Sequence, residues 1–181
     1  VPKSRKAMTK SDKTTIRLID QSAATVHETI KMGADNPDNF YQSAAINPKH
    51  DYRITGTRGT VDYLGISTII NKYASGGTME VTGHIDSRQM ELGPNGELEI
   101  IISRNKQPGN WLPMGEASNS ILIRQTFMDR GQEIPAEISI ERLDSGATPA
   151  PLTAQQLDTG LKTAAAFVQN TARLFADWSQ S

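Results

Sequence analysis

The chain has 181 residues, 36% hydrophobic and 22% charged, which is enough for one full domain. Its 19 basic and 20 acidic side chains leave a formal net charge of −1, which argues against nucleic acid as a partner. The absence of cysteine excludes disulfides, thiolate nucleophiles and zinc–thiolate sites. Because no apolar run approaches the roughly 18–20 residues of a membrane span and the N-terminal residues lack a signal-peptide core, we predict a cytoplasmic protein without a membrane partner.

The amino-terminal part is predicted to contain an arm, a helix and a turn region. Residues 1–12 are basic and are predicted to be a flexible arm, or an arm that contacts a partner. Residues 13–33 repeat apolar side chains at spacings of three and four, which predicts an N-terminal helix that ends at Gly33. Residues 34–51 are rich in Asn, Asp and Pro, which is typical of turns.

Residues 34–145 are predicted to form a β-sandwich domain. Six or seven short strands are expected, in DYRITG, TVDYLGISTIINKY, TMEVTGHID, RQMEL, ELEIIISR, NSILIRQTFM and AEISIERL. The Pro-Asn-Gly sequence at residues 94–96 predicts a tight hairpin between RQMEL and ELEIIISR. Short antiparallel strands at this spacing favour a sandwich or a jelly roll.

Residues 146–181 are predicted to form a linker and a C-terminal helix, which leads back to the sheet or into a separate region. Thr153 is a plausible N-cap, and apolar side chains from Leu157 to Trp178 form one broad face. A face this broad needs a cover, so a homo-oligomer or partner-domain contact through this helix is expected. The predicted fold class is α+β, mainly β: an antiparallel jelly-roll-like β-sandwich with an N-terminal and a C-terminal helix.

Four residues are candidates for catalysis. His84 precedes Asp86 by two positions, so the two side chains would share one face of a strand as an acid–base pair, or as a solvent-exposed pair. Asp35 and Asp38 lie in the oxygen-rich sequence DNPDN, which suits calcium but lacks the twelve-residue EF-hand pattern, so Asx-turns are the preferred interpretation. The three histidines are far apart in sequence, and we predict neither a metal site nor a cofactor.

Four other residues are candidates for ligand binding. Arg53 and Arg124 lie in predicted strands and would bind a carboxylate or phosphate if they share a face; cross-strand ion pairs are the alternative. Arg58 lies in TGTRGT, which is either an anion-holding loop or a simple turn. Trp111, in KQPGNWLPMG, is either a platform for a flat ligand or a plug at one end of the core.

The order of several motifs resembles a known family. NPDNFYQSAAINPKHDYRITGTRGTVDYLGIS, followed by LGPNGELEIIISRNKQPGNWLPMGEASNSILIRQTF, resembles the β-rich domains of the domain of unknown function 1214 family. The matching features are Asn-Pro-Asp, Tyr-Arg-Ile-x-Gly and Asn-Trp-Leu-Pro, and the resemblance covers about residues 36–142. It implies a jelly-roll-like sandwich, comparable in fold with viral capsid and sugar-handling domains, and it supplies no catalytic residues.

These observations lead to two hypotheses about function. The first is a non-catalytic β-sandwich binding or assembly module whose small-molecule ligand is carbohydrate-like or anionic, because aromatic faces and arginine forks hold such compounds. The alternative is a hydrolase or lyase that uses carboxylates and arginines on a polyhydroxylated or acidic substrate.

Overall fold

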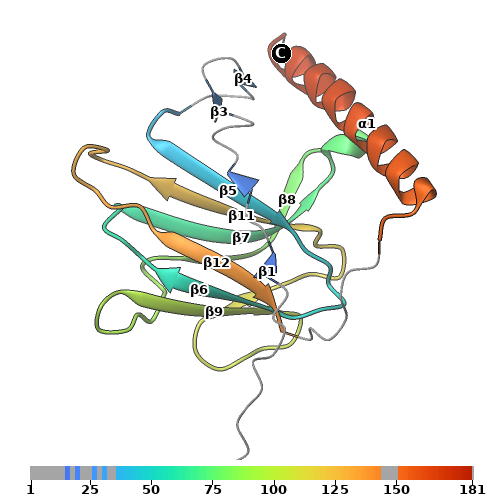
Figure 1. Ribbon diagram of the computed structural model, residues 1–181. Coiled ribbons are helices and arrows are strands. Elements are labelled where there is room, and N and C mark those ends of the chain that lie inside the picture. The colour runs from blue at the N-terminus through green and yellow to red at the C-terminus, as the bar shows by residue number, and fades with distance from the viewer. Residues whose placement is uncertain are drawn as a thin grey trace, which may run out of the picture.

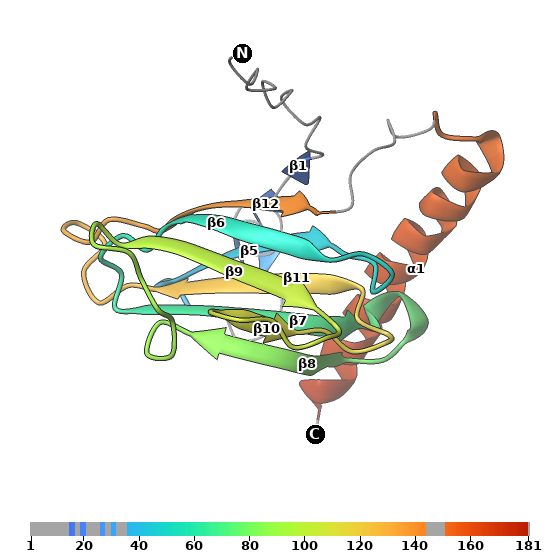
Figure 2. The same ribbon diagram turned by 90° about the horizontal axis from the view of Figure 1, so that it is seen from below.

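The computed structural model describes residues 36–143 and 151–180, together with four two-residue strand segments nearer the N-terminus. Two five-stranded sheets lie face to face as two layers, and a long C-terminal helix stands beside them (Figures 1 and 2). The described part is therefore mainly β with a C-terminal helix, as the composition and periodicity predicted.

The two sheets are named sheet A and sheet B. In spatial order, sheet A contains β1 (Thr15–Ile16), β12 (Glu137–Arg142), β6 (Tyr52–Thr57), β9 (Glu97–Ser103) and β10 (Trp111–Pro113). Sheet B contains β2 (Ile19–Asp20), β5 (Asn39–Ala45), β11 (Ser120–Thr126), β7 (Tyr63–Asn71) and β8 (Met79–Asp86). The remaining elements are the pair β3 (Val26–His27) and β4 (Ile30–Lys31), the short 3₁₀ helix η1 (Tyr73–Ser75) and the helix α1 (Ala154–Trp178). Neighbouring strands are antiparallel, except that β10 runs parallel to β9.

The N-terminal helix predicted for residues 13–33 is wrong wherever the structure describes this segment. β1 pairs with β12 of sheet A, β2 pairs with β5 of sheet B, and β3 and β4 pair with each other. The segment is rich in Thr, Ile and Val, which favour strands, and the open edges of β12 and β5 supply hydrogen-bonding partners that a helix would not use. The rest of this segment and the arm 1–12 lie outside the described residues.

The strands predicted between residues 52 and 142 are confirmed, apart from RQMEL, and β5 and β10 were missed. The hairpin predicted around the Pro-Asn-Gly turn is wrong in its pairing: Gly96 has the expected positive φ of 79°, but β9 pairs with β6 and β10. β8 ends at Asp86, whose carboxylate accepts a hydrogen bond from the Arg88 N–H at 2.8 Å. The chain then crosses from sheet B to sheet A instead of folding back on β8.

The core lies between the two sheets and is mostly isoleucine and leucine. Alternate residues of each central strand point inward, so Ile54, Ile100 and Ile140 of sheet A and Ile66 and Ile123 of sheet B are completely buried. The intervening residues of sheet B point away from the core and form its outer face. That outer face carries the candidate site.

The C-terminal helix α1 is confirmed, with the predicted N-cap. The Thr153 hydroxyl accepts a hydrogen bond from the Gln156 N–H, and the Gln156 side chain accepts one from the Thr153 N–H, which completes a capping box. α1 packs on η1, where the Tyr73 ring lies 5.9 Å from the ring of Phe167 and 6.3 Å from that of Phe175. In the described part of the chain, no helix combines the length and apolar character needed to span a membrane.

Candidate functional site

A pocket of about 390 Å³ lies on the outer face of sheet B. We call it the sheet B pocket. It is lined by Tyr41, Tyr63, Gly65, Ser67, Val81, His84, Leu122 and Arg124. These residues come from four neighbouring strands, β5, β11, β7 and β8, which are far apart in sequence. Strand register therefore assembles the pocket, because outward-facing residues of adjacent strands lie side by side.

Arg124 occupies the centre of one cross-sheet row. It lies directly opposite Tyr41 on β5 and opposite Gly65 on β7. The Tyr63 ring leans over Gly65, where a Cβ atom would lie only 2.4 Å from the Tyr63 hydroxyl oxygen. The Arg124 guanidinium lies over this ring, with its central carbon 5.1 Å from the ring centroid. The missing side chain at position 65 thus makes room for the ring that supports the guanidinium.

Arg124 carries a positive charge that the described residues do not neutralise. Among these residues, no carboxylate lies within ion-pair distance of its guanidinium. Burial alone would lower the pKa of Arg124, but its interactions with the hydroxyls of Tyr63 and Tyr41 raise that pKa above the ordinary value. Arg124 is therefore a permanent cation between phenol groups, which is an arrangement suited to an anion.

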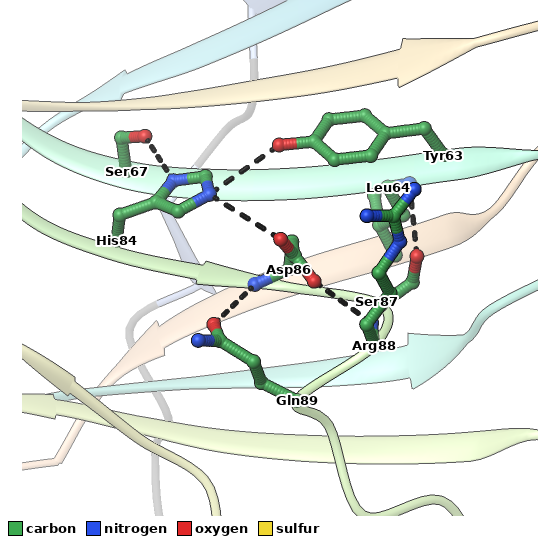
Figure 3. Close-up of polar contacts among 8 residues, drawn as sticks. All are labelled: Tyr63, Leu64, Ser67, His84, Asp86, Ser87, Arg88 and Gln89. Atoms are coloured by element: carbon green, nitrogen blue, oxygen red, sulfur yellow. Dashed lines mark hydrogen bonds and ion pairs between the residues drawn. The ribbon is translucent and has the colours of Figure 1, made fainter.

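His84 lies beside Arg124's row and is held by two hydroxyl groups (Figure 3). The Ser67 Oγ lies 2.9 Å from Nδ1 of His84, and the Tyr63 hydroxyl lies 3.3 Å from Nε2. The register explains the first contact, because His84 and Ser67 are paired across β8 and β7. The imidazole is exposed, so it can exchange hydrogen bonds with a ligand in the pocket.

Asp86 lies on the same face of β8 as His84, as their spacing predicted. Its Oδ2 is 3.9 Å from His84 Nε2, which is too long for a hydrogen bond, and its Oδ1 holds the turn after β8 (Figure 3). Asp86 is half-buried and does not line the pocket. It therefore supplies negative charge next to His84 while serving mainly as a turn residue.

The other two candidate arginines lie elsewhere. Arg53, on β6, faces outward from sheet A, and its guanidinium contacts Glu141 at 3.2 Å and Glu99 at 3.5 Å. This is the cross-strand ion-pair alternative, in a different sheet from Arg124. Arg58 donates hydrogen bonds to the carbonyls of Gly59 and Asp62 at 3.4 and 3.1 Å, as a loop arginine that holds its own turn.

Trp111 does not line the sheet B pocket. It begins β10, and its indole N–H donates to the Ser103 hydroxyl at 3.1 Å and to the Ser103 carbonyl at 3.3 Å. The ring is half-buried, and the preceding Asn110 bonds the backbone of Glu91 and Glu99. In this position the indole and its loop fix β10 against β9.

The carboxylate candidates do not form a pair. Asp38 is exposed in the turn before β5, where its N–H donates to the Asn36 side chain in an Asx-turn and its own side chain lines no part of the sheet B pocket. Asp35 lies outside the described residues. Within the described ranges, no group of three or more His, Asp or Glu side chains is placed to hold a metal ion.

Sequence reasoning missed most of the pocket wall. Tyr63, Gly65 and Ser67 alternate along one strand, and Leu122 and Arg124 do so along another, so the face of each residue was readable from the sequence. The missing information was which strands are neighbours. The aromatic pair Phe40 and Tyr41 was expected to favour ligand binding, but the strand β5 that places Tyr41 in the pocket was missed, because the Asn and Pro content of its segment indicates turns.

Comparison with known proteins identifies structural neighbours. No family model matches this chain, and neither does any curated protein. A crystal structure of an uncharacterized protein from Burkholderia cenocepacia matches 89% of the chain with 47% identity and a TM-score of 0.83, and the match covers 44% of that protein. The chain thus spans less than half the length of this relative. The VPA0106 protein from Vibrio parahaemolyticus is 20% identical over 60% of this chain and 32% of its own, with a TM-score of 0.44.

Proposed function

We propose that this chain is a non-catalytic β-sandwich binding module whose sheet B pocket holds a small anionic ligand, with sugar acids as the leading class. The observation that carries the proposal is Arg124, a guanidinium without a carboxylate partner among the described residues, held over an aromatic ring inside a pocket. A ligand carboxylate or phosphate would give this guanidinium an anionic partner through charge-assisted hydrogen bonds.

The remaining pocket residues favour a polyhydroxylated anion over a bare ion. Ser67 and His84 place hydroxyl and imidazole groups next to the cation, which suits ligand hydroxyls. Val81 and Leu122 add apolar surface against which the carbon skeleton of a sugar ring can rest.

We further propose that the sandwich is a jelly-roll-like domain of the domain of unknown function 1214 kind. The order of its Asn-Pro-Asp, Tyr-Arg-Ile-x-Gly and Asn-Trp-Leu-Pro motifs supports this assignment, as does a chain path that moves repeatedly between two packed sheets. The pocket would then be a feature of one face of that domain.

Binding is tested by thermal shift and by titration with three probes, glucuronate, inorganic phosphate and glucose. We expect glucuronate to raise the melting temperature and glucose to have little effect. A response to phosphate alone would support an anion-binding site but would contradict a sugar acid as its ligand. Absence of any shift with all three probes would refute the proposal.

The matched variants are Arg124→Gln and Arg53→Gln, which remove one arginine from each sheet. Arg124→Gln is expected to weaken glucuronate binding by about 10- to 100-fold, because it removes a charge-assisted hydrogen bond between the guanidinium and the ligand carboxylate. Arg53→Gln should leave the ligand-induced shift unchanged, because Arg53 is occupied by Glu99 and Glu141. Equal losses in both variants would show that the pocket is not the binding site.

The second candidate is an enzyme of the hydrolase or lyase type. Its support is the position of the Tyr63 hydroxyl next to His84 and close to the Arg124 guanidinium, which places groups able to accept a proton beside a cation that could hold a carboxylate. Hydrolysis by paired carboxylates has less support, because Asp38 and Asp86 do not line the pocket. Incubation with a polyuronate distinguishes the two candidates: an unsaturated product seen by ultraviolet absorbance, and lost in Tyr63→Phe, would establish a lyase.

A further inference from the structure

The Tyr41 hydroxyl of the sheet B pocket is bonded to a pair of side chains that lie outside the pocket. Asn39 Nδ2 donates a hydrogen bond to the Tyr41 oxygen at 3.0 Å, and the Thr126 hydroxyl donates one to Asn39 Oδ1 at 2.7 Å. The register of β5 and β11 explains this row, because Thr126 lies opposite Asn39 just as Arg124 lies opposite Tyr41. Neither Asn39 nor Thr126 lines the pocket, so a ligand there meets Tyr41 and not this pair.

These contacts determine the polarity of the Tyr41 hydroxyl. A phenol hydroxyl has one hydrogen to donate and two lone pairs that accept. Asn39 donates to this oxygen, and the Arg124 guanidinium, which has donors only, interacts with the same oxygen. Among the described residues, none accepts a hydrogen bond from the Tyr41 hydroxyl. Its hydrogen is therefore available to a ligand in the pocket.

A hydroxyl that donates suits a carboxylate, because an ionised carboxylate only accepts hydrogen bonds. The neighbouring Arg124 guanidinium also only donates, so the two side chains offer one neutral and one charged donor to the same ligand group. The amide of Asn39 decides whether this holds. With its nitrogen and oxygen exchanged, the amide oxygen would accept the Tyr41 hydrogen, and none would remain for the ligand.

We propose that Asn39, anchored by Thr126, is a positioning residue that makes the Tyr41 hydroxyl a hydrogen-bond donor to the carboxylate of the bound ligand. The inference rests on the proposed function of the sheet B pocket. It adds to that function a second contact for the carboxylate, beside Arg124, and two residues outside the pocket on which the contact depends.

Asn39→Asp tests the polarity, because a carboxylate of the same shape accepts the hydrogen that Tyr41 otherwise offers to the ligand. Glucuronate affinity is measured by titration in Asn39→Asp, in Tyr41→Phe and in the double variant. Tyr41→Phe should weaken binding about tenfold, through loss of one hydrogen bond to a charged group. Asn39→Asp should weaken it about tenfold more in the presence of the Tyr41 hydroxyl than in Tyr41→Phe, where only the added charge acts. Equal effects of Asn39→Asp in the two backgrounds would overturn the proposal.

A measurement on the ligand-free protein separates this inference from the proposed function. The Nδ2 hydrogens of Asn39 give nuclear magnetic resonance signals, which are assigned by their disappearance in Asn39→Asp. We expect Tyr41→Phe to shift these signals more than Thr126→Val does, because the amide nitrogen donates to Tyr41 and the amide oxygen faces Thr126. A larger shift in Thr126→Val would show the reversed amide and overturn the inference, even if glucuronate binds. Absence of glucuronate binding by the wild-type protein would instead refute the proposed function, and the carboxylate contact with it.

Discussion

Gly65 is the residue on which the geometry of the sheet B pocket depends most directly. In Gly65→Ala, the new Cβ would lie 2.4 Å from the hydroxyl oxygen of Tyr63 and 2.7 Å from Cε1 and Cζ of its ring. Ordinary contacts between such atoms lie at about 3.5–4.0 Å, so the ring must move by roughly 1 Å or rotate away. The Arg124 guanidinium, 5.1 Å from the ring centroid, would then lose its support.

The expected effect on folding is small and the effect on binding is larger. The clash is with a side chain on the outer face of the sheet, which can swing into solvent, and alanine recovers roughly 0.5–1 kcal/mol of the backbone entropy that glycine loses on folding. The free energy of unfolding should therefore change by less than about 1 kcal/mol. Loss of the cation–π contact, about 0.5–1 kcal/mol, and of the ring as a wall of the pocket should weaken glucuronate binding about tenfold.

Two measurements check this reasoning. The chain has three histidines, so the His84 imidazole signal can be assigned in a nuclear magnetic resonance spectrum and should shift in Gly65→Ala, because the Tyr63 hydroxyl lies 3.3 Å from His84 Nε2. Glucuronate affinity is then measured in a double-mutant cycle with Tyr63→Ala. We expect Gly65→Ala to have no further effect once the ring is absent.

Two outcomes would contradict the argument. An undiminished effect of Gly65→Ala in the Tyr63→Ala background would mean that the ring is not the cause. A loss of several kcal/mol in the free energy of unfolding, measured in urea, would mean that the strand itself is displaced and that the pocket is not the affected feature.

Three further predictions concern stability. Gln125 is fully buried on β11, where its side chain donates a hydrogen bond to the Ala136 carbonyl at 3.1 Å and accepts one from the Ala136 N–H at 2.7 Å. Gln125→Leu leaves both backbone groups without these partners and should lower the free energy of unfolding by about 2–5 kcal/mol in urea titrations. A loss below about 1 kcal/mol would refute this prediction. Burial raises the pKa of Tyr73 above 10.0, the ordinary value, which the unfolded chain retains. The contribution of Tyr73 to the free energy of unfolding is therefore fully present below pH 10.0 and is lost as the pH rises through the higher pKa of the folded state. Tyr73→Phe should lack this loss at high pH, and identical pH profiles of the two proteins would refute the prediction. Thr153→Ala removes the cap of α1 and should cost about 1 kcal/mol, seen as faster hydrogen exchange in the first turn; unchanged exchange would show that the cap is not needed.

The candidate site could be predicted from the sequence only in part. His84 and Arg124 were both identified, and the spacing of His84 and Asp86 placed them on one face, because side-chain direction along a strand is a local property. Their convergence could not be predicted. It depends on β7 lying between β8 and β11, and strand order is set by long-range packing that periodicity does not encode.

The sequence by itself determined the elements whose signals are local. Alternating apolar residues specified the central strands, and Thr153 with a following apolar stripe specified α1, since propensity, capping and periodicity act within a few residues. The tertiary structure decided the rest. Within segment 13–33, β1 and β2 pair with the open edges of β12 and β5, in spite of the helical spacing of the sequence.

The two strand arginines show most clearly which properties depend on local sequence and which depend on tertiary structure. Arg53 and Arg124 are indistinguishable by sequence pattern, since each alternates with isoleucine in a strand. Their neighbours on adjacent strands differ: Arg53 lies between glutamates, whereas Arg124 lies between a tyrosine and a glycine. Only the pairing of the strands decides which guanidinium is neutralised and which remains for a ligand, because the electrostatic environment of a side chain is set by residues that are close in space.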